Sequence, residues 1–306
     1  MKGYRFHVVL AALIVLGGLV GFYASTKQTE RSPTAPDRPT AERIPSDQPL
    51  PSEPPELKPE AVAHLSPEFP PSAVAGEYVI HFSSHEDYLA YLAALRVAGH
   101  KTLGELEELL AVRIPSDAFG AVDLAEHKAR SSFSYAVKSP LPPVEIDPEA
   151  LAGLRAYGES AEAIVGGVPH GDGAGVLVAI LDSGIEAHQH FDEVDIRQMD
   201  FTDRGVAGPG ASHGTSVASI ISGREGIAPK AGLLVMRVLD DKGEGNSSNV
   251  AEGIVEATKQ GAKIINLSLG VYQDSPLLRQ AVDYAHDRGV LLVAAAGNDG
   301  YDRLSY

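Results

Sequence analysis

An aspartate and a histidine stand where general-base chemistry could be assembled. Asp182 directly follows the apolar run Val176–Leu181, and His213 opens a helical pattern 31 residues later, counted from 182 to 213. Alone, the aspartate could be a turn or cap residue and the histidine a solvated polar residue. Together at one edge of a sheet, the carboxylate could hold one imidazole nitrogen and leave the other free to accept a proton. We therefore take the pair as candidate catalytic residues.

Two more apolar runs end in small or polar residues. Ser268, Leu269 and Gly270 end one run, where small side chains would let another backbone approach closely. Asn298 ends the other and offers a neutral N–H donor to a developing oxyanion. Its alternative role is an ordinary turn, because it lies in a Gly-Asn-Asp-Gly sequence.

The elements that must position these residues alternate in type from Gly173 onward. Continuous apolar runs are typical of strands covered on both faces, and helical periodicity separates them. This alternation predicts an α/β fold with a doubly wound, mostly parallel sheet, whose sites form at the carboxyl ends of the strands. The expected strands are 176–181, 233–239, 263–267 and 290–296, and the expected helices are 213–222, 248–260 and 276–288.

In their order along the chain, four blocks resemble the subtilisin-like serine proteases, peptidase family S8. They are Val178–Ile185, Ser212–Thr215, Asn266–Gly270 and Ala295–Asn298. In that family the catalytic residues follow the chain order Asp, His, Ser. The resemblance covers residues 173 to 300 and implies a serine endopeptidase that acts on proteins or peptides.

The resemblance also implies a role for each matching residue. Asp182 would orient His213, which would be the general base, and Asn298 would complete the oxyanion hole. Residues 268–270 would pair with the substrate backbone as a β-strand. A smaller unit over 76–138 looks like the family's inhibitory propeptide through its βαβ pattern, which makes it an intramolecular partner.

The nucleophile departs from the family pattern. The family's serine lies in a Gly-Thr-Ser-Met-Ala-x-Pro motif, and the chain ends eight residues after Asn298 without one. Ser216 imitates the motif, but it lies three residues from His213 on the same expected helix and cannot face both the base and a substrate carbonyl. Two readings stay open: an endopeptidase sequence truncated before its serine, or an inactive, membrane-tethered protease relative that binds peptides. The first is favoured, and the chain as given is expected to be inactive alone.

Neither a metal nor a cofactor is expected. Only the short segment Gly223–Pro229 separates the His213 helix from the next strand, where many family members carry a longer calcium loop. The glycine cluster 166–175 precedes its strand instead of following it, which excludes a dinucleotide-binding loop. The chain has no cysteine, and this excludes disulfides, thiolate metal sites and a cysteine nucleophile.

The N-terminal quarter differs in composition from the rest of the chain. Lys2 and Arg5 precede the apolar run Val8–Ala24, which predicts a signal peptide or membrane anchor over residues 1–25. Cleavage after Ala24 would put Phe22 at the −3 position, where a small residue is needed, so an uncleaved anchor is favoured. Twelve of the 21 prolines lie between positions 33 and 71, and residues 26–75 are expected to form a disordered linker.

The remaining segments complete the expected organisation. The unit over 76–138 should contain strands at 77–82, 109–114 and 133–137, a helix up to Gly99 and a shorter helical stretch to His127. A connecting segment over 139–172 and the catalytic portion over 173–306 follow. The net charge is −16, and the sequence has no cluster of Lys and Arg residues of the kind that binds nucleic acid. The signal peptide or membrane anchor predicted over residues 1–25 makes the expected location extracytoplasmic, membrane-anchored or secreted.

Overall fold

The computed structural model describes residues 72–139, 171–202 and 212–295. The predicted anchor 1–25, nearly all of the linker and most of the connecting segment lie outside these residues. Within the described ranges, no helix combines the length and apolar character needed to cross a membrane.

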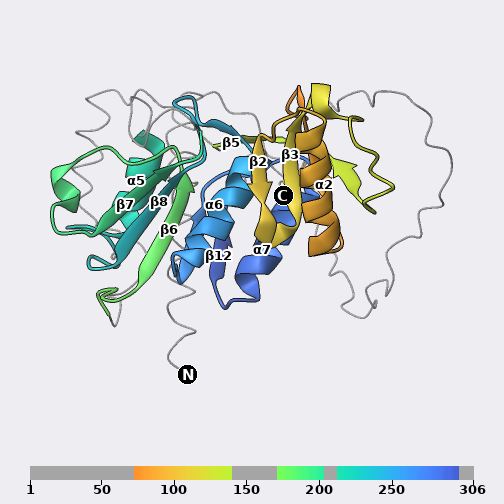
Figure 1. Ribbon diagram of the computed structural model, residues 1–306. Coiled ribbons are helices and arrows are strands. Elements are labelled where there is room, and N and C mark those ends of the chain that lie inside the picture. The colour runs from red at the N-terminus through yellow and green to blue at the C-terminus, as the bar shows by residue number, and fades with distance from the viewer. Residues whose placement is uncertain (1–71, 140–170, 203–211, 296–306) are drawn as a thin grey trace, which may run out of the picture.

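Residues 171–295 contain a five-stranded parallel sheet in the order β12-β10-β6-β8-β7, which confirms the doubly wound α/β fold (Figure 1). The apolar runs form four of its strands because both faces of those strands are covered. The edge strand β7 was not predicted, since its residues are only partly buried and include Arg197 and Gln198. The strands are β6 (Leu177–Asp182), β7 (Ile196–Asp200), β8 (Gly232–Arg237), β10 (Ile264–Leu267) and β12 (Leu291–Ala294).

Helices cover both faces of this sheet, close to the predicted positions. Helix α5 (Ser212–Ile221) packs on the face that carries Val178 and Ile180. Helices α6 (Ser247–Lys259) and α7 (Pro276–His286) pack on the opposite face. A short 3-10 helix, η3 (Gln189–Phe191), lies between β6 and β7.

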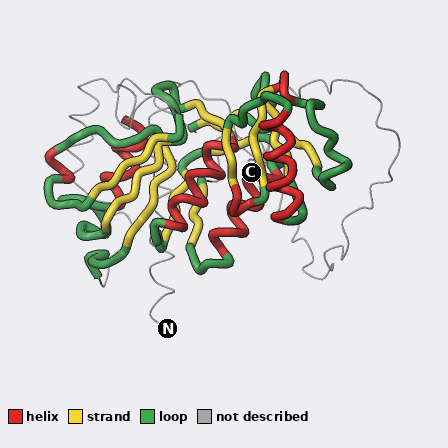
Figure 2. The backbone as a smooth tube through the Cα atoms, in the orientation of Figure 1, coloured by secondary structure: helices red, strands yellow, loops and turns green. Residues whose placement is uncertain are grey.

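Residues 72–139 form a second unit around an antiparallel sheet in the order β2-β3-β1-β4. Its single α-helix, α2, is capped by Ser84, whose side chain accepts a hydrogen bond from Asp87 N. Figures 1 and 2 show helices α6 and α7 between this sheet and the parallel one. The elements are β1 (Glu77–His81), α2 (His85–Val97), β2 (Gly104–Leu106), η1 (Glu107–Leu109), β3 (Ala111–Pro115), η2 (Ser116–Ala118) and β4 (Arg130–Ser132).

Three expectations for this unit were wrong in detail. The helical stretch to His127 is only the 3-10 turn η2 followed by turns, because Gly120 adopts a positive φ of 87°. The expected strand 133–137 is not continuous: β4 ends before it at Ser132, and only its last two residues belong to a strand, β5 (Ala136–Lys138). The β1 and β3 strands pair antiparallel, so the βαβ pattern is not a parallel crossover.

A third, small sheet joins the two units. Strand β5 lies between β9 (Glu244–Asn246) and β11 (Gly270–Val271) and is antiparallel to both. The end of the N-terminal unit is thus built into a sheet whose other strands belong to residues 171–295.

Candidate active site

Asp182 ends strand β6 and is completely buried, with no exposed surface. Its backbone carbonyl accepts hydrogen bonds from Val238 N at 2.9 Å and Leu239 N at 3.2 Å. Its Oδ1 atom accepts one from Ser183 N at 2.7 Å. The carboxylate is therefore fixed at the carboxyl edge of the sheet, where a site was predicted.

His213, the second residue of α5, points its ring at this carboxylate. Its Nδ1 atom lies 2.9 Å from both Asp182 Oδ1 and Asp182 Oδ2. Because a carboxylate only accepts hydrogen bonds, Nδ1 carries the proton and donates it. The other ring nitrogen, Nε2, is then the one that can accept a proton, and the side chain keeps a fifth of its surface exposed, at 20%.

The environment of His213 sets its affinity for protons. Burial alone would lower the pKa of the imidazole, but the hydrogen bond to Asp182 and the charge of that carboxylate outweigh burial. The net result is a pKa raised above the ordinary value of 6.5. A raised pKa means that the carboxylate partner stabilises the imidazolium. A general base needs this stabilisation once it has accepted a proton.

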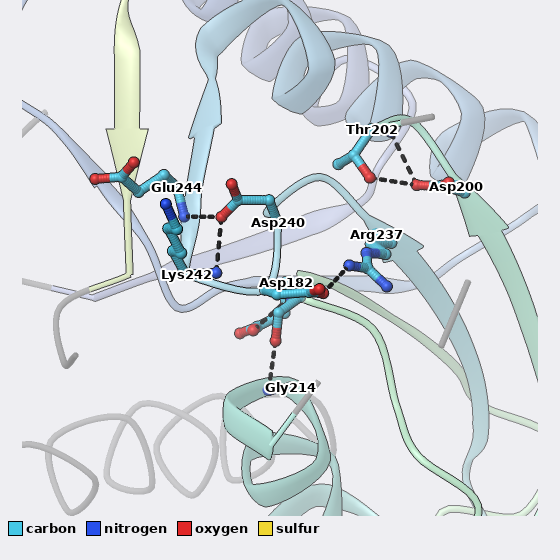
Figure 3. Close-up of polar contacts among 10 residues, drawn as sticks. Asp182, Asp200, Thr202, Gly214, Arg237, Asp240, Lys242 and Glu244 are labelled. Carbon is cyan, nitrogen blue, oxygen red and sulfur yellow. Dashed lines mark hydrogen bonds and ion pairs between the residues drawn. The ribbon is translucent and has the colours of Figure 1, made fainter. Parts of the chain in front are cut away.

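Close backbone approach makes the pair possible. A Cβ atom on Gly214 would lie 2.2 Å from the carbonyl oxygen of Gly184, so only glycine lets α5 start this close to the end of β6. The Gly214 N–H also donates to Ser183 Oγ at 3.3 Å. Figure 3 shows Gly214 at the start of the helix, below the strand end that carries Asp182. This supporting role of Ser183 was not predicted from the sequence.

The predicted substrate-pairing segment leads into strand β11, which pairs with β5. Gly270, in the predicted substrate-pairing segment, pairs with Lys138 of β5, whereas Ser268 and Leu269 precede β11 and are buried. Ser268 Oγ accepts a hydrogen bond from Asn266 Nδ2 at 3.0 Å, which holds this turn. Of the predicted trio, therefore, Gly270 pairs with an extended segment.

Strand β9, which pairs with the other side of β5, was not predicted from the sequence. It pairs with β5 through Asn246, Gly245 and Glu244. A tight turn holds it in place, because the Asp240 carboxylate accepts from the backbone N–H groups of Lys242 and Glu244, each at 2.9 Å (Figure 3). The available signal was the Gly-Glu-Gly sequence at 243–245, where a Cβ on Gly245 would meet the Val238 carbonyl oxygen at 2.3 Å.

The remaining predictions for the site concern Asn298, Ser216 and metal binding. Asn298 lies outside the described residues, so its oxyanion role remains a prediction. Ser216 occupies α5 with His213, as expected, and its backbone carbonyl accepts from Ser219 Oγ at 2.8 Å. Among the residues that the structure describes, no group of three or more acidic or histidine side chains is placed to hold a metal ion.

Residues 173–305 match the model of the subtilase family. Thermitase from Thermoactinomyces vulgaris is 40% identical over 144 residues, which are 44% of this chain and 52% of thermitase. Subtilisin Savinase from Lederbergia lenta is 41% identical over 142 residues, again 44% of this chain and 52% of the relative. The chain thus spans about half the length of these relatives.

One solved structure extends the likeness to the N-terminal unit. Fervidolysin from Fervidobacterium pennivorans, described as a keratinolytic enzyme related to subtilisin, matches 76% of this chain and 41% of its own with a TM-score of 0.62. The sequence identity is 24%, so this match concerns the fold alone. Because it covers more of the chain than residues 173–305, it includes part of what precedes them.

Proposed function

We propose that residues 173–305, which match the model of the subtilase family, form part of a serine endopeptidase that hydrolyses proteins or peptides. The observation that carries the proposal is the buried Asp182 carboxylate, both of whose oxygens lie 2.9 Å from His213 Nδ1. His213 Nε2 takes the proton of an attacking serine hydroxyl and later returns it to the leaving amine. Asp182 keeps the ring in the right tautomer and stabilises the imidazolium.

The attacking serine and the oxyanion donor complete the proposal. We assign the oxyanion donor to Asn298 by its match to the family motif. The printed sequence has no Gly-Thr-Ser-Met-Ala-x-Pro segment, so the 306-residue chain by itself is proposed to be inactive. Asp182 and His213 can only accept a proton, and water is a poor substitute for a positioned nucleophile.

The test of activity joins the chain to a C-terminal segment that carries Gly-Thr-Ser-Met-Ala-x-Pro. We expect turnover of a chromogenic peptide and labelling by a fluorophosphonate probe, and both should be lost in His213→Ala. Equal labelling of the His213→Ala variant would contradict the proposal. So would robust turnover and labelling of the unextended chain, since its serines would then include a nucleophile.

The pairing itself is testable in the full chain by NMR titration of His213. We expect a midpoint above the ordinary value of 6.5, because Asp182 favours the charged ring. Asp182→Asn should lower the midpoint, since burial then acts without a compensating charge. The exposed Asp192→Asn variant is the matched control and should leave it unchanged. A midpoint that Asp182→Asn does not move would remove Asp182 from its assigned role.

Peptide binding without hydrolysis is the second candidate function. It is favoured by one observation: β5 lies between β9 and β11 and pairs antiparallel with both. The same observation supports an inhibitory role for the N-terminal unit, because a strand seated there excludes any other peptide. An extended chain that binds peptides yet fails to hydrolyse them would favour this candidate.

An extracytoplasmic location completes the proposal. It is supported by the positive start before the apolar run Val8–Ala24 and by relatives such as the minor extracellular protease Epr of Bacillus subtilis. The apolar run would act as a signal peptide or as a membrane anchor. Protease treatment of intact cells should release the portion from Gly76 onward, and full protection of that portion would contradict an outward orientation.

A further inference from the structure

A cluster of buried hydroxyl groups lies under the segment that leads into β5. Ser134, Ser247 and Ser248 have no exposed surface, and Ser275 is 4% exposed. Ser134 belongs to the N-terminal unit, whereas the other three belong to residues 171–295. The interface between the units is therefore polar at this point. These hydroxyl groups add to the contact made by the three residue pairs that join β5 to β9.

Ser134 is held through its side chain. Ser248 Oγ donates to Ser134 Oγ at 2.9 Å. Ser134 Oγ in turn donates to Asn246 Oδ1 over a longer distance of 3.5 Å. The same Asn246 oxygen caps helix α6 by accepting from Asn249 N at 2.8 Å. Since the helix cap fixes Asn246, a donor and an acceptor face Ser134 from one rigid element.

Backbone contacts set the register of the segment. Ser247 N donates to the Tyr135 carbonyl at 2.8 Å, and Tyr135 N donates to Ser247 Oγ at 3.0 Å. Two residues after Tyr135, Val137 pairs with Gly245 and is completely buried. A peptide in this register must therefore place its residue at the Ser134 position against Ser248.

The hydrogen bond between Ser134 and Ser248 should discriminate between bound peptides more strongly than the nearby ion pair of Lys138 and Glu244 does. Lys138 and Glu244 form an ion pair at 2.9 Å, but their side chains are 56% and 52% exposed, and water screens such pairs. Removal of a buried hydrogen-bond partner instead leaves a group without water or protein to satisfy it. An alanine at the Ser134 position would leave the Ser248 hydroxyl without the acceptor that it now uses.

We infer that Ser248 and Asn246, with the backbone of Ser247, form a hydroxyl-binding subsite that accepts serine from an extended peptide. The serine lies three residues before the peptide residue paired with Gly245. The inference rests on the proposed function in one respect, namely that peptide substrates bind between β9 and β11 as β5 does. In the structure the chain's own Ser134 is the occupant.

The first experiment is a double-mutant cycle in the full chain, read by amide hydrogen exchange. The amides of Ser139 and Ser247 report detachment of the segment, since they donate to Gly243 O and Tyr135 O. Ser134→Ala and Ser248→Ala should each speed exchange on the order of ten-fold, and the double variant should be no faster than either. The exposed Ser131→Ala variant is the control and should change nothing.

Two results of this experiment would overturn the inference: changes below about two-fold, or single effects that multiply in the double variant. Ser134→Cys keeps the volume of the side chain while weakening its hydrogen bonds, and it should behave like Ser134→Ala. Protection of the Ile180 amide in β6 serves as the measure that each variant has folded.

The second experiment asks whether a separate peptide is recognised in the same way. The host is the full chain with Ser134→Ala and Lys138→Glu, in which the resident segment lacks its hydroxyl and meets Glu244 with a like charge. A synthetic peptide of residues 132–139 should protect the Ser247 amide several-fold more than its Ser134→Ala counterpart. Adding Ser248→Ala to the host should remove the difference.

Equal protection by the two peptides, including none by either, would overturn the inference. Neither experiment measures hydrolysis. A failure of the subsite is therefore distinguishable from a failure of the proposed endopeptidase activity, which the fluorophosphonate labelling decides.

Discussion

The two sheets of this molecule are covered in different ways. The parallel sheet of residues 171–295 has its own helices on both faces, α5 on one and α6 with α7 on the other. The antiparallel sheet of residues 72–139 has its own helix, α2, on one face. Its second face packs on α6 and α7, where Val79 and Ala111 join the core of the neighbouring domain. The N-terminal unit therefore needs the domain to complete its burial.

Strand β1 shows this division residue by residue. Tyr78 and Ile80 point into the core beneath α2, while Glu77, Val79 and His81 face the other way. The face toward α2 is aromatic and aliphatic, and it serves the stability of the unit. The face toward α6 and α7 mixes apolar and ionisable groups, so correct docking depends on paired polar contacts as well as on burial.

Truncation of one side chain in each core should show which unit depends on the other for its stability. Ile180→Ala in β6 and Leu95→Ala in α2 both remove a side chain with no exposed surface, and each should cost about 2–5 kcal/mol. Ile180→Ala should lower the denaturant midpoints of both units, whereas Leu95→Ala should lower only that of residues 72–139. Hydrogen exchange resolved by segment measures this, and equal effects of the two variants on both units would contradict the asymmetry.

Much of this arrangement was predictable from local pattern. Val176–Leu181 is a continuous apolar run, and such a run becomes a central strand wherever helices cover it on both sides. Asp182 and His213 were found because each follows or opens an element at the same sheet edge. The pattern needed no knowledge of long-range contacts.

The missed features depend on contacts that no local pattern encodes. Strand β9 has only three residues, and it becomes a strand because β5 lies beside it. The expected strand 133–137 divides because Tyr135 forms a bridge with Ala73 while Ala136–Lys138 turn to the other unit. Ser134 reads as an ordinary polar residue in sequence, and only the docked units show that it is buried.

Loss of Arg113 should have the next largest effect. Arg113 Nη2 donates to Glu77 Oε2 at 2.9 Å, and Arg113 Nη1 donates to Asn249 Oδ1 of α6 at 3.0 Å. The two side chains of the ion pair are 12% and 8% exposed, so Arg113→Ala would leave a carboxylate almost buried without its partner. We expect a loss of about 3 kcal/mol, measured by denaturant unfolding of residues 72–139.

The matched control removes both charges. Arg113→Met combined with Glu77→Gln keeps the side-chain volumes and leaves no unpaired charge, and it should recover most of the stability. If the double variant were as unstable as Arg113→Ala, the cost would come from lost packing and not from the isolated carboxylate.

Acidification should weaken the same interface through His81, by less than the loss of Arg113. Its ring is held between Gln280 Oε1 of α7 at 3.1 Å and Ser132 Oγ of β4 at 2.7 Å, and Arg130 is its register neighbour on β4. Burial lowers the pKa of His81, and the hydrogen bond to Gln280 offsets this only in part. The unfolded unit therefore binds the proton more tightly than the docked unit does.

The sign of the effect follows from this difference. The stability that neutral His81 allows is present above its ordinary pKa of 6.5 and is lost as the pH falls through the lowered value. The protection factors of the amides in β1, which are corrected for the intrinsic pH dependence of exchange, should fall between about pH 7 and pH 5 in the natural chain. The fall should be smaller in His81→Gln, which cannot titrate, and an unchanged fall would assign it to other groups.

The smallest effect is expected where the two units meet in solvent, at Lys138 and Glu244. The hydrogen bond to Glu244 and then its charge raise the pKa of Lys138, so the contribution of the pair is fully present at neutral pH and is lost only as the pH rises through that value. Because both side chains are more than half exposed, Glu244→Gln should speed exchange of the Ser139 amide by no more than about two-fold. Salt at about 1 M should remove even this difference, because it screens exposed charges beyond a few ångströms. A salt-resistant effect as large as that of Ser134→Ala would reverse the ranking and make the charged contact the main anchor of β5.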